Sequence, residues 1–68
     1  NPSNGKFRIE SEIEITEFEI LDLNGKVLTS KILERLKSLD CDFNKQGVYI
    51  LHITLLDKSK TIKRLVIK

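Results

Sequence analysis

The sequence predicts a single all-β domain over residues 1–68, folded as a small antiparallel sandwich of six to seven short strands. Apolar and polar residues alternate in several short runs, which is the period of a strand with one buried face. Turn-forming residues separate these runs. With 68 residues, 40% hydrophobic and 32% charged, the chain has the size and composition of one globular unit. An open barrel is the alternative arrangement of the same strands.

The first five residues are expected to form a loop, because Pro2 fixes its own φ and Asn4-Gly5 can adopt the positive φ values of a tight turn. Residues 6–10 then alternate polar and apolar side chains, which predicts the first strand. Residue 1 is Asn rather than Met, and no signal-peptide pattern follows it. We therefore expect the chain to be a fragment of a longer protein.

Residues 13–20 predict a strand with an irregularity. Their apolar positions change from odd to even between Ile15 and Phe18. Because side chains alternate strictly along a strand, this change requires a bulge or a break between these two residues. We expect the main strand to run over residues 17–23.

A hairpin turn is predicted at residues 22–26, where Asn24-Gly25 lies between two apolar-rich runs and favours a type I′ turn. The returning strand is expected over residues 26–32. Asp22 and Asn24 would also suit a calcium loop, but the remaining oxygen ligands and the distal Glu of such a loop are missing. Asp22, Asn24 and Gly25 are therefore assigned to the turn.

Two patterns conflict in residues 32–39. Their aliphatic residues have helical spacing, but the stretch is too short for a stable helix and lacks a capping box. Residues 39–43 alternate as a strand. We expect an extended or irregular connection here.

Two further strands are predicted at residues 47–56 and 61–68, joined by the polar turn of residues 57–60 and paired antiparallel. The first is almost continuously apolar, which is typical of a central strand covered on both faces. The second runs to the end of the chain. It is either simply the last strand of the domain or an element that another molecule recognises.

The residue sets of common catalytic and metal sites are missing from the sequence. Cys41 is the only cysteine and His52 the only histidine, and both occupy runs in which a structural role is expected. The glutamates alternate with apolar residues, as on the solvent face of a sheet. We expect no enzymatic activity and no cofactor. Nucleic-acid binding is disfavoured because the aromatic residues occupy apolar-phase positions.

The net charge of +2 is unevenly distributed. Up to Asp22 there are two basic and six acidic residues, a balance of −4, and from Leu23 there are ten basic and four acidic residues, a balance of +6. We expect acidic and basic strands to face each other across a sheet. The alternative is a basic C-terminal surface that binds an acidic partner.

Four segments, in this order and spacing, resemble the type A C-terminal sorting domain of the type IX secretion system of Gram-negative bacteria. They are Asn-Pro-Ser-Asn-Gly-Lys-Phe at residues 1–7, Ile-Leu-Asp-Leu-Asn-Gly-Lys-Val at residues 20–27, Gly-Val-Tyr-Ile-Leu at residues 47–51 and Lys-Arg-Leu-Val-Ile-Lys at residues 63–68. The resemblance covers essentially the whole chain. It implies an immunoglobulin-like sandwich.

The resemblance also implies a function. Such a domain is a secretion signal at the C-terminus of a larger cargo protein, which passes through the periplasm and the outer-membrane translocon to the cell surface or the medium. In many members a sortase-like peptidase then removes the domain. Asn1, Pro2 and Gly5 would form the turn that follows the linker to the cargo. The signal would lie in Gly47, Val48, Tyr49, Lys63, Arg64, Leu65, Val66, Ile67 and Lys68.

A structural or adhesive β-sandwich module that binds a protein or a glycan is the alternative function. It would be favoured if these residues lay inside a longer chain instead of at its end. Isolated copies could also pair weakly through exposed edge strands.

Overall fold

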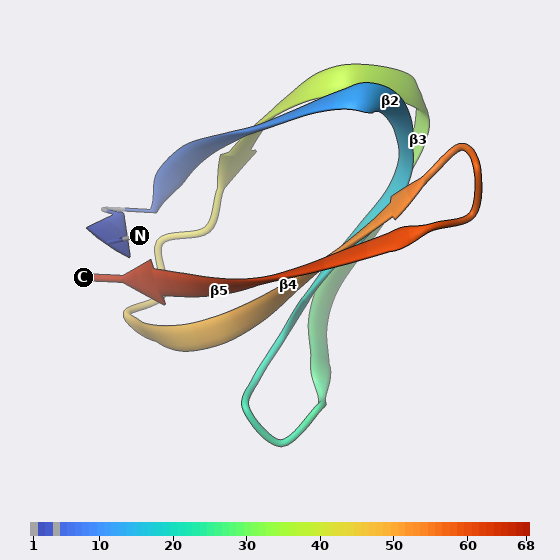
Figure 1. The fold of residues 1–68 in the computed structure, drawn as a ribbon. Coiled ribbons are helices and arrows are strands. Elements are labelled where there is room, and N and C mark those ends of the chain that lie inside the picture. The colour runs from blue at the N-terminus through green and yellow to red at the C-terminus, as the bar shows by residue number, and fades with distance from the viewer. Residues whose placement is uncertain (1, 4) are drawn as a thin grey trace.

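The computed structural model describes the backbone of residues 2, 3 and 5–68 and the side chains of residues 5–68, so Asn1 and Asn4 lie outside the described residues. The described chain forms five strands: β1 (Pro2–Ser3), β2 (Lys6–Leu21), β3 (Val27–Asp42), β4 (Gly47–Leu55) and β5 (Lys60–Ile67). They belong to one sheet in the order β1-β5-β4-β2-β3 (Figure 1). Nothing in the described part of the chain is a helix long and apolar enough to cross a membrane.

The all-β antiparallel class is confirmed, but the expected six to seven short strands are not. β2 and β3 each span 16 residues and pair along most of their length. Their pairing register shifts between Glu10 and Ile15 and again between Ile15 and Glu17, and Arg35 has a φ of 57°. Such bulges bend a strand without ending it. The sequence pattern therefore suggested more strands than the structure contains.

The bend folds the single sheet into two layers. Figure 1 shows β2 and β3 curving together, so that the start of β2 and the end of β3 lie across from β4 and β5. The two layers are thus halves of one sheet rather than the two separate sheets that were expected. The predicted irregularity between Ile15 and Phe18 is confirmed, because both neighbours of β2 change register between Ile15 and Glu17. Residues 32–39, which were expected to form an extended or irregular connection, are extended and belong to β3.

The hydrophobic core lies between the two layers. Ile9, at the start of β2, belongs to one buried cluster with side chains of β4 and β5 from the other layer. The cluster comprises Ile9, Ile15, Phe18, Ile20, Tyr49, Leu51, Ile53, Leu65 and Ile67. In β4 the buried residues alternate with half-buried ones. β4 is central, as predicted, but only one of its faces is fully buried. The continuous apolar run had suggested two buried faces.

The two hairpin turns share one geometry, and it is not the predicted type I′. In the first, Gly25 N–H donates to the Asp22 carbonyl at 3.1 Å and Asp22 N–H to the Lys26 carbonyl at 2.9 Å. Within this turn only Gly25 has a positive φ, at 88°, whereas type I′ needs two such residues. The pattern is that of a type I turn followed by a bulge residue in the left-handed region.

The second turn repeats this geometry with a lysine in the bulge position. Lys58 N–H donates to the Leu55 carbonyl and Leu55 N–H to the Ser59 carbonyl, both at 2.9 Å, and Lys58 has a φ of 70°. A non-glycine residue in this conformation is strained. The Asp57 carboxylate accepts hydrogen bonds from the backbone N–H and the hydroxyl of Ser59, which supports the turn and lowers the pKa of Asp57.

Candidate recognition surface at the terminal strand

The terminal strand β5 pairs with a neighbouring strand along both edges at its end and along one edge elsewhere. It pairs antiparallel with β4 from Lys60 to Ile67, which confirms the predicted pairing of the last two strands. On its other side the two-residue β1 pairs with it in parallel, Pro2 opposite Val66 and Ser3 opposite Ile67. No other strand of the described chain pairs with that side. The edge of β5 from residue 60 to 65 therefore remains open.

The side chains of the terminal segment divide into two groups. Leu65 and Ile67 lie in the core, with exposed fractions of 6% and 2%. Lys63, Arg64 and Lys68 are exposed, and Val66 is half-buried. Leu65 and Ile67 therefore fix β5 to the domain. Lys63 shares their face of the strand but is exposed beside a cavity, whereas Arg64 and Val66 lie on the opposite face.

Gly47, Val48 and Tyr49 lie directly beside this segment. Gly47 is opposite Ile67, Val48 opposite Val66 and Tyr49 opposite Leu65. The structure therefore places two groups of predicted signal residues, some twenty positions apart in the sequence, next to each other in the sheet.

Tyr49 is a structural anchor rather than an accessible side chain. It is 6% exposed, its hydroxyl donates to the Gln46 carbonyl at 3.0 Å, and its ring meets Phe43 edge to face with centroids 5.0 Å apart. Gly47 has a φ of 147°, and a Cβ at this position would lie 2.9 Å from the Tyr49 hydroxyl oxygen. Only glycine fits under the tyrosine in this backbone conformation.

The first five residues were expected to form a loop, but Pro2 and Ser3 form strand β1, and Gly5 packs against the loop that precedes β4. Gly5 is buried with a φ of 106°, and a Cβ there would lie 2.7 Å from the Asn44 Cα. Its carbonyl accepts a hydrogen bond from Phe43 N–H at 2.7 Å. Together with the pairing of Pro2 and β5, this brings the start of the chain beside its end, as Figure 1 shows.

The predicted hairpin-turn residues lie elsewhere. Figure 1 shows the loop between β2 and β3 projecting away from both chain ends. The Asp22 carboxylate accepts hydrogen bonds at 2.9 Å from the backbone N–H groups of Asn24 and Lys26. Asp22, Asn24 and Gly25 thus shape this turn and do not join the terminal segment.

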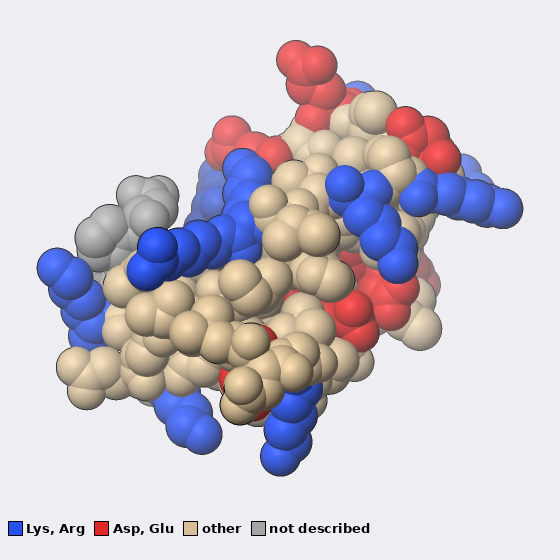
Figure 2. All heavy atoms as spheres, turned by 60° about the horizontal axis from the view of Figure 1, so that its bottom comes forward, with Lys and Arg blue, Asp and Glu red and all other residues tan. Residues whose placement is uncertain are grey.

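Basic side chains gather around β5 without acidic partners. β5 carries Lys60, Lys63 and Arg64 and no acidic residue. Figure 2 shows Lys and Arg side chains around a largely uncharged face of the molecule. Within residues 5–68, no ion pair joins β5 to the acidic strand β2. The expected pairing of acidic and basic strands is therefore wrong for β5.

Among the described residues, one close ion pair joins β2 and β3 within a single layer. Arg8 of β2 donates through Nε to the Asp40 carboxylate of β3 at 2.8 Å. This hydrogen bond, with the attraction between the charges, lowers the pKa of Asp40. Both side chains are exposed, so the pair contributes little to stability at moderate salt concentration.

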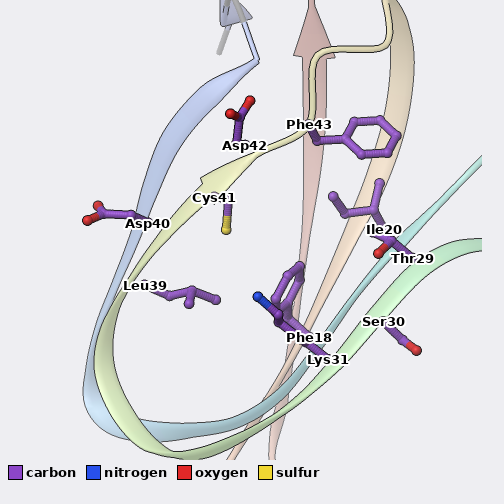
Figure 3. Close-up of a pocket in the computed structure, with 10 residues that line it drawn as sticks. All are labelled: Phe18, Ile20, Thr29, Ser30, Lys31, Leu39, Asp40, Cys41, Asp42 and Phe43. Carbon is purple, nitrogen blue, oxygen red and sulfur yellow. The ribbon is translucent and has the colours of Figure 1, made fainter.

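A cavity of about 160 Å³ lies between the two halves of β3. Figure 3 shows Leu39 and Cys41 on one side of it and Phe18 with Ile20 on the other. Burial raises the pKa of the half-buried Cys41 thiol, which keeps it protonated at neutral pH. No group of three or more potential metal ligands occurs in the part of the chain that the structure describes.

Ile62, Lys60 and β1 were not singled out from the sequence. Ile62 is 63% exposed on the outward face of β5. The alternation with Leu65 and Ile67 contained the signal for its orientation, because residues 62 and 67 differ in parity. The parallel pairing of β1 had no sequence signal, since two residues are too few to show a period.

The family model for the secretion system C-terminal sorting domain matches residues 1–68. The chain belongs to this family. The resemblance inferred from the four sequence segments is thereby confirmed. No curated protein and no solved structure matches the chain.

Membership of the sorting-domain family indicates the general role of the domain, which is protein export. A type IX sorting signal implies an attached cargo, the secretion machinery, and export to the cell surface or beyond. In this sorting domain the predicted signal residues occupy neighbouring strands, and the start and the end of the chain lie side by side.

Proposed function

We propose that residues 1–68 are a non-catalytic C-terminal signal that directs an attached cargo through the type IX outer-membrane translocon of a Gram-negative bacterium. The observation that carries this proposal is the family match over the whole chain. The open basic edge of β5 beside the Gly47-Val48-Tyr49 segment supports it, because a signal needs accessible groups on a fixed scaffold.

The signal residues divide into two roles in this proposal. Gly47, Tyr49, Leu65 and Ile67 hold β5 in place through packing and backbone pairing. Lys63, Arg64 and Lys68 are contacted by the machinery, because their side chains are exposed, and the half-buried Val66 and Val48 support them. Deletion of the terminal segment would therefore abolish the fold and the contacts together.

The cargo precedes residue 1 in the proposed protein. Strand β1, with Pro2, and the packed Gly5 would then hold the end of the linker against β5. A sortase-like peptidase would cut in the linker after passage through the periplasm and the outer membrane, and the cargo would stay at the surface or be released. The bent two-layer sheet serves as a reduced immunoglobulin-like sandwich that keeps the signal folded.

A fusion experiment tests this proposal. Residues 1–68 are attached to the C-terminus of a periplasmic reporter in a bacterium with a type IX system, and the reporter is assayed in the periplasm, at the surface and in the medium. We expect delivery to the surface or medium for the fusion and retention in the periplasm when residues 64–68 are deleted. A fusion that stays in the periplasm, or a truncated fusion that is delivered normally, would contradict the proposal.

A further inference from the structure

The open edge of β5 borders a groove between the two layers. A cavity of about 160 Å³ is lined by residues 7–10 of β2 on one side and by residues of β4 and β5 on the other. Phe7, Ile9, Leu51 and Leu65 give it an apolar floor, and Lys63 with Arg64 lies at the β5 wall. Within the residues that the structure describes, β1 pairs only with Val66 and Ile67, so the rest of this edge has no strand partner there.

The backbone groups that face outward from this edge follow from the hairpin geometry. Leu55 N–H donates to the Ser59 carbonyl, so these two residues form a hydrogen-bonded pair. Hydrogen-bonded and non-hydrogen-bonded pairs alternate in an antiparallel ladder. Thr61, Lys63 and Leu65 therefore bond to β4. Ile62 and Arg64 direct their N–H and C=O groups away from β4, toward the open side.

The positive charge of β5 determines which kind of strand can pair with its open edge. β5 has three basic residues and no acidic one, and Lys68 follows it. A second copy that paired β5 with β5 would place lysine and arginine opposite lysine and arginine, which destabilises a ladder. A strand with acidic side chains would instead be attracted, and apolar side chains alternating with them would fit the floor of the groove.

We propose that β5 recruits its partner by strand addition: an extended, alternately acidic and apolar segment of another protein pairs with the open edge at Lys60–Leu65. The exposed Ile62 packs against this segment on the outer face. This inference rests on the proposed function, since the partner would belong to the secretion machinery. It assigns the backbone contact to the middle of β5, because β1 already pairs with Val66 and Ile67.

Proline substitution tests the backbone contact. Ile62→Pro removes an outward N–H that has no partner within the sheet, and edge strands tolerate proline in this orientation. Ile62→Ala is the matched control, because it shortens the same side chain and keeps the N–H. In the reporter fusion we expect Ile62→Pro to lower surface delivery by about tenfold or more, and Ile62→Ala to lower it much less.

A charge-reversed pair tests the acidic partner independently. Lys60→Glu with Arg64→Glu should lower surface delivery about tenfold, whereas Lys26→Glu with Lys45→Glu, exposed residues outside β5, should leave it nearly unchanged. Unfolding midpoints of the purified fusions establish which variants fold. If Ile62→Pro unfolds the domain, the surface delivery of the charge-reversed variants decides whether the inference stands.

The outcomes separate the two proposals. If the unmodified fusion stays in the periplasm, the proposed function fails, whatever the edge does. If it is delivered and folded Ile62→Pro is delivered equally well, or if both charge-reversed pairs behave alike, the strand-addition inference is overturned. Sedimentation of the fusion identifies self-pairing: a dimer that Ile62→Pro converts to a monomer would make a second copy the occupant and overturn the acidic partner.

Discussion

Replacing Gly47 with alanine should release the tyrosine anchor beside the terminal strand. The added Cβ would lie 2.9 Å from the Tyr49 hydroxyl oxygen, and alanine would have to adopt a φ of 147°. Backbone strain of this kind costs about 1–3 kcal/mol. Loss of the Tyr49 hydrogen bond to the Gln46 carbonyl adds about 1 kcal/mol. We expect Gly47→Ala to lower the free energy of unfolding by about 2–4 kcal/mol.

That loss is large for a domain of this size. A chain of 68 residues has a total stability of about 3–10 kcal/mol. Urea unfolding of the purified domain, followed by circular dichroism, would measure the change in midpoint for every variant, including those that lack the tyrosine. Tyr49→Phe is the matched control. It removes the hydrogen bond but keeps the ring against Phe43, so it should cost only about 1 kcal/mol.

The double variant tests the reasoning most directly. In Gly47→Ala/Tyr49→Phe the hydroxyl that crowds the new Cβ is gone. The double variant should therefore lose less free energy of unfolding than the sum of the losses of the two single variants. Strain at residue 47 remains, because the backbone conformation is unchanged. Strictly additive losses, or a Gly47→Ala domain as stable as the original, would refute the view that Gly47 is required by the packing of Tyr49.

Three further predictions follow from other residues. Lys58→Gly should raise the free energy of unfolding by about 0.5–1 kcal/mol in urea titrations, and Gly25→Lys should lower it, because both positions require a positive φ; a destabilised Lys58→Gly variant would contradict the shared turn geometry. Because folding lowers the pKa of Asp40, the stability that Asp40 contributes is present above its unfolded-state pKa and is lost as pH falls through its folded-state pKa. Asp40→Asn should therefore make the free energy of unfolding fall less steeply on acidification. An unchanged pH dependence would show that the ion pair with Arg8 is absent in solution. Cys41 should react slowly with iodoacetamide at neutral pH and faster in urea, since burial keeps its thiol protonated, and equal rates in both conditions would disprove its burial.

The sequence was most informative where one face of a strand is buried. The alternation around Leu65 and Ile67 and the change of phase between Ile15 and Phe18 located β5 and the bulge of β2. It was least informative at residues 32–39, where a residue with positive φ interrupts the alternation within one continuous strand. A bulge and a chain break give the same local pattern, so the strand count could not be obtained from the sequence.

The proposed recognition surface was predicted only in outline. Motif resemblance identified the terminal segment and Gly47-Val48-Tyr49, but it could not separate residues that hold the strand from residues that face solvent. Alternation separates the two faces of β5, but which part of its edge is open depends on β1, far away in the sequence. Long-range pairing of so short a strand leaves no periodic signal.

The parallel contact between β1 and β5 also determines how the domain would carry mechanical load. Pro2 lies beside Val66 and Ser3 beside Ile67, so the two chain ends leave this contact in opposite directions. If the cargo pulled on the start of the chain while a receptor gripped its end, the force would act along the two strands in opposite senses. The bonds between them would then be loaded together in shear instead of opening one after another, and the force would be transmitted through the two residue pairs that the structure describes there.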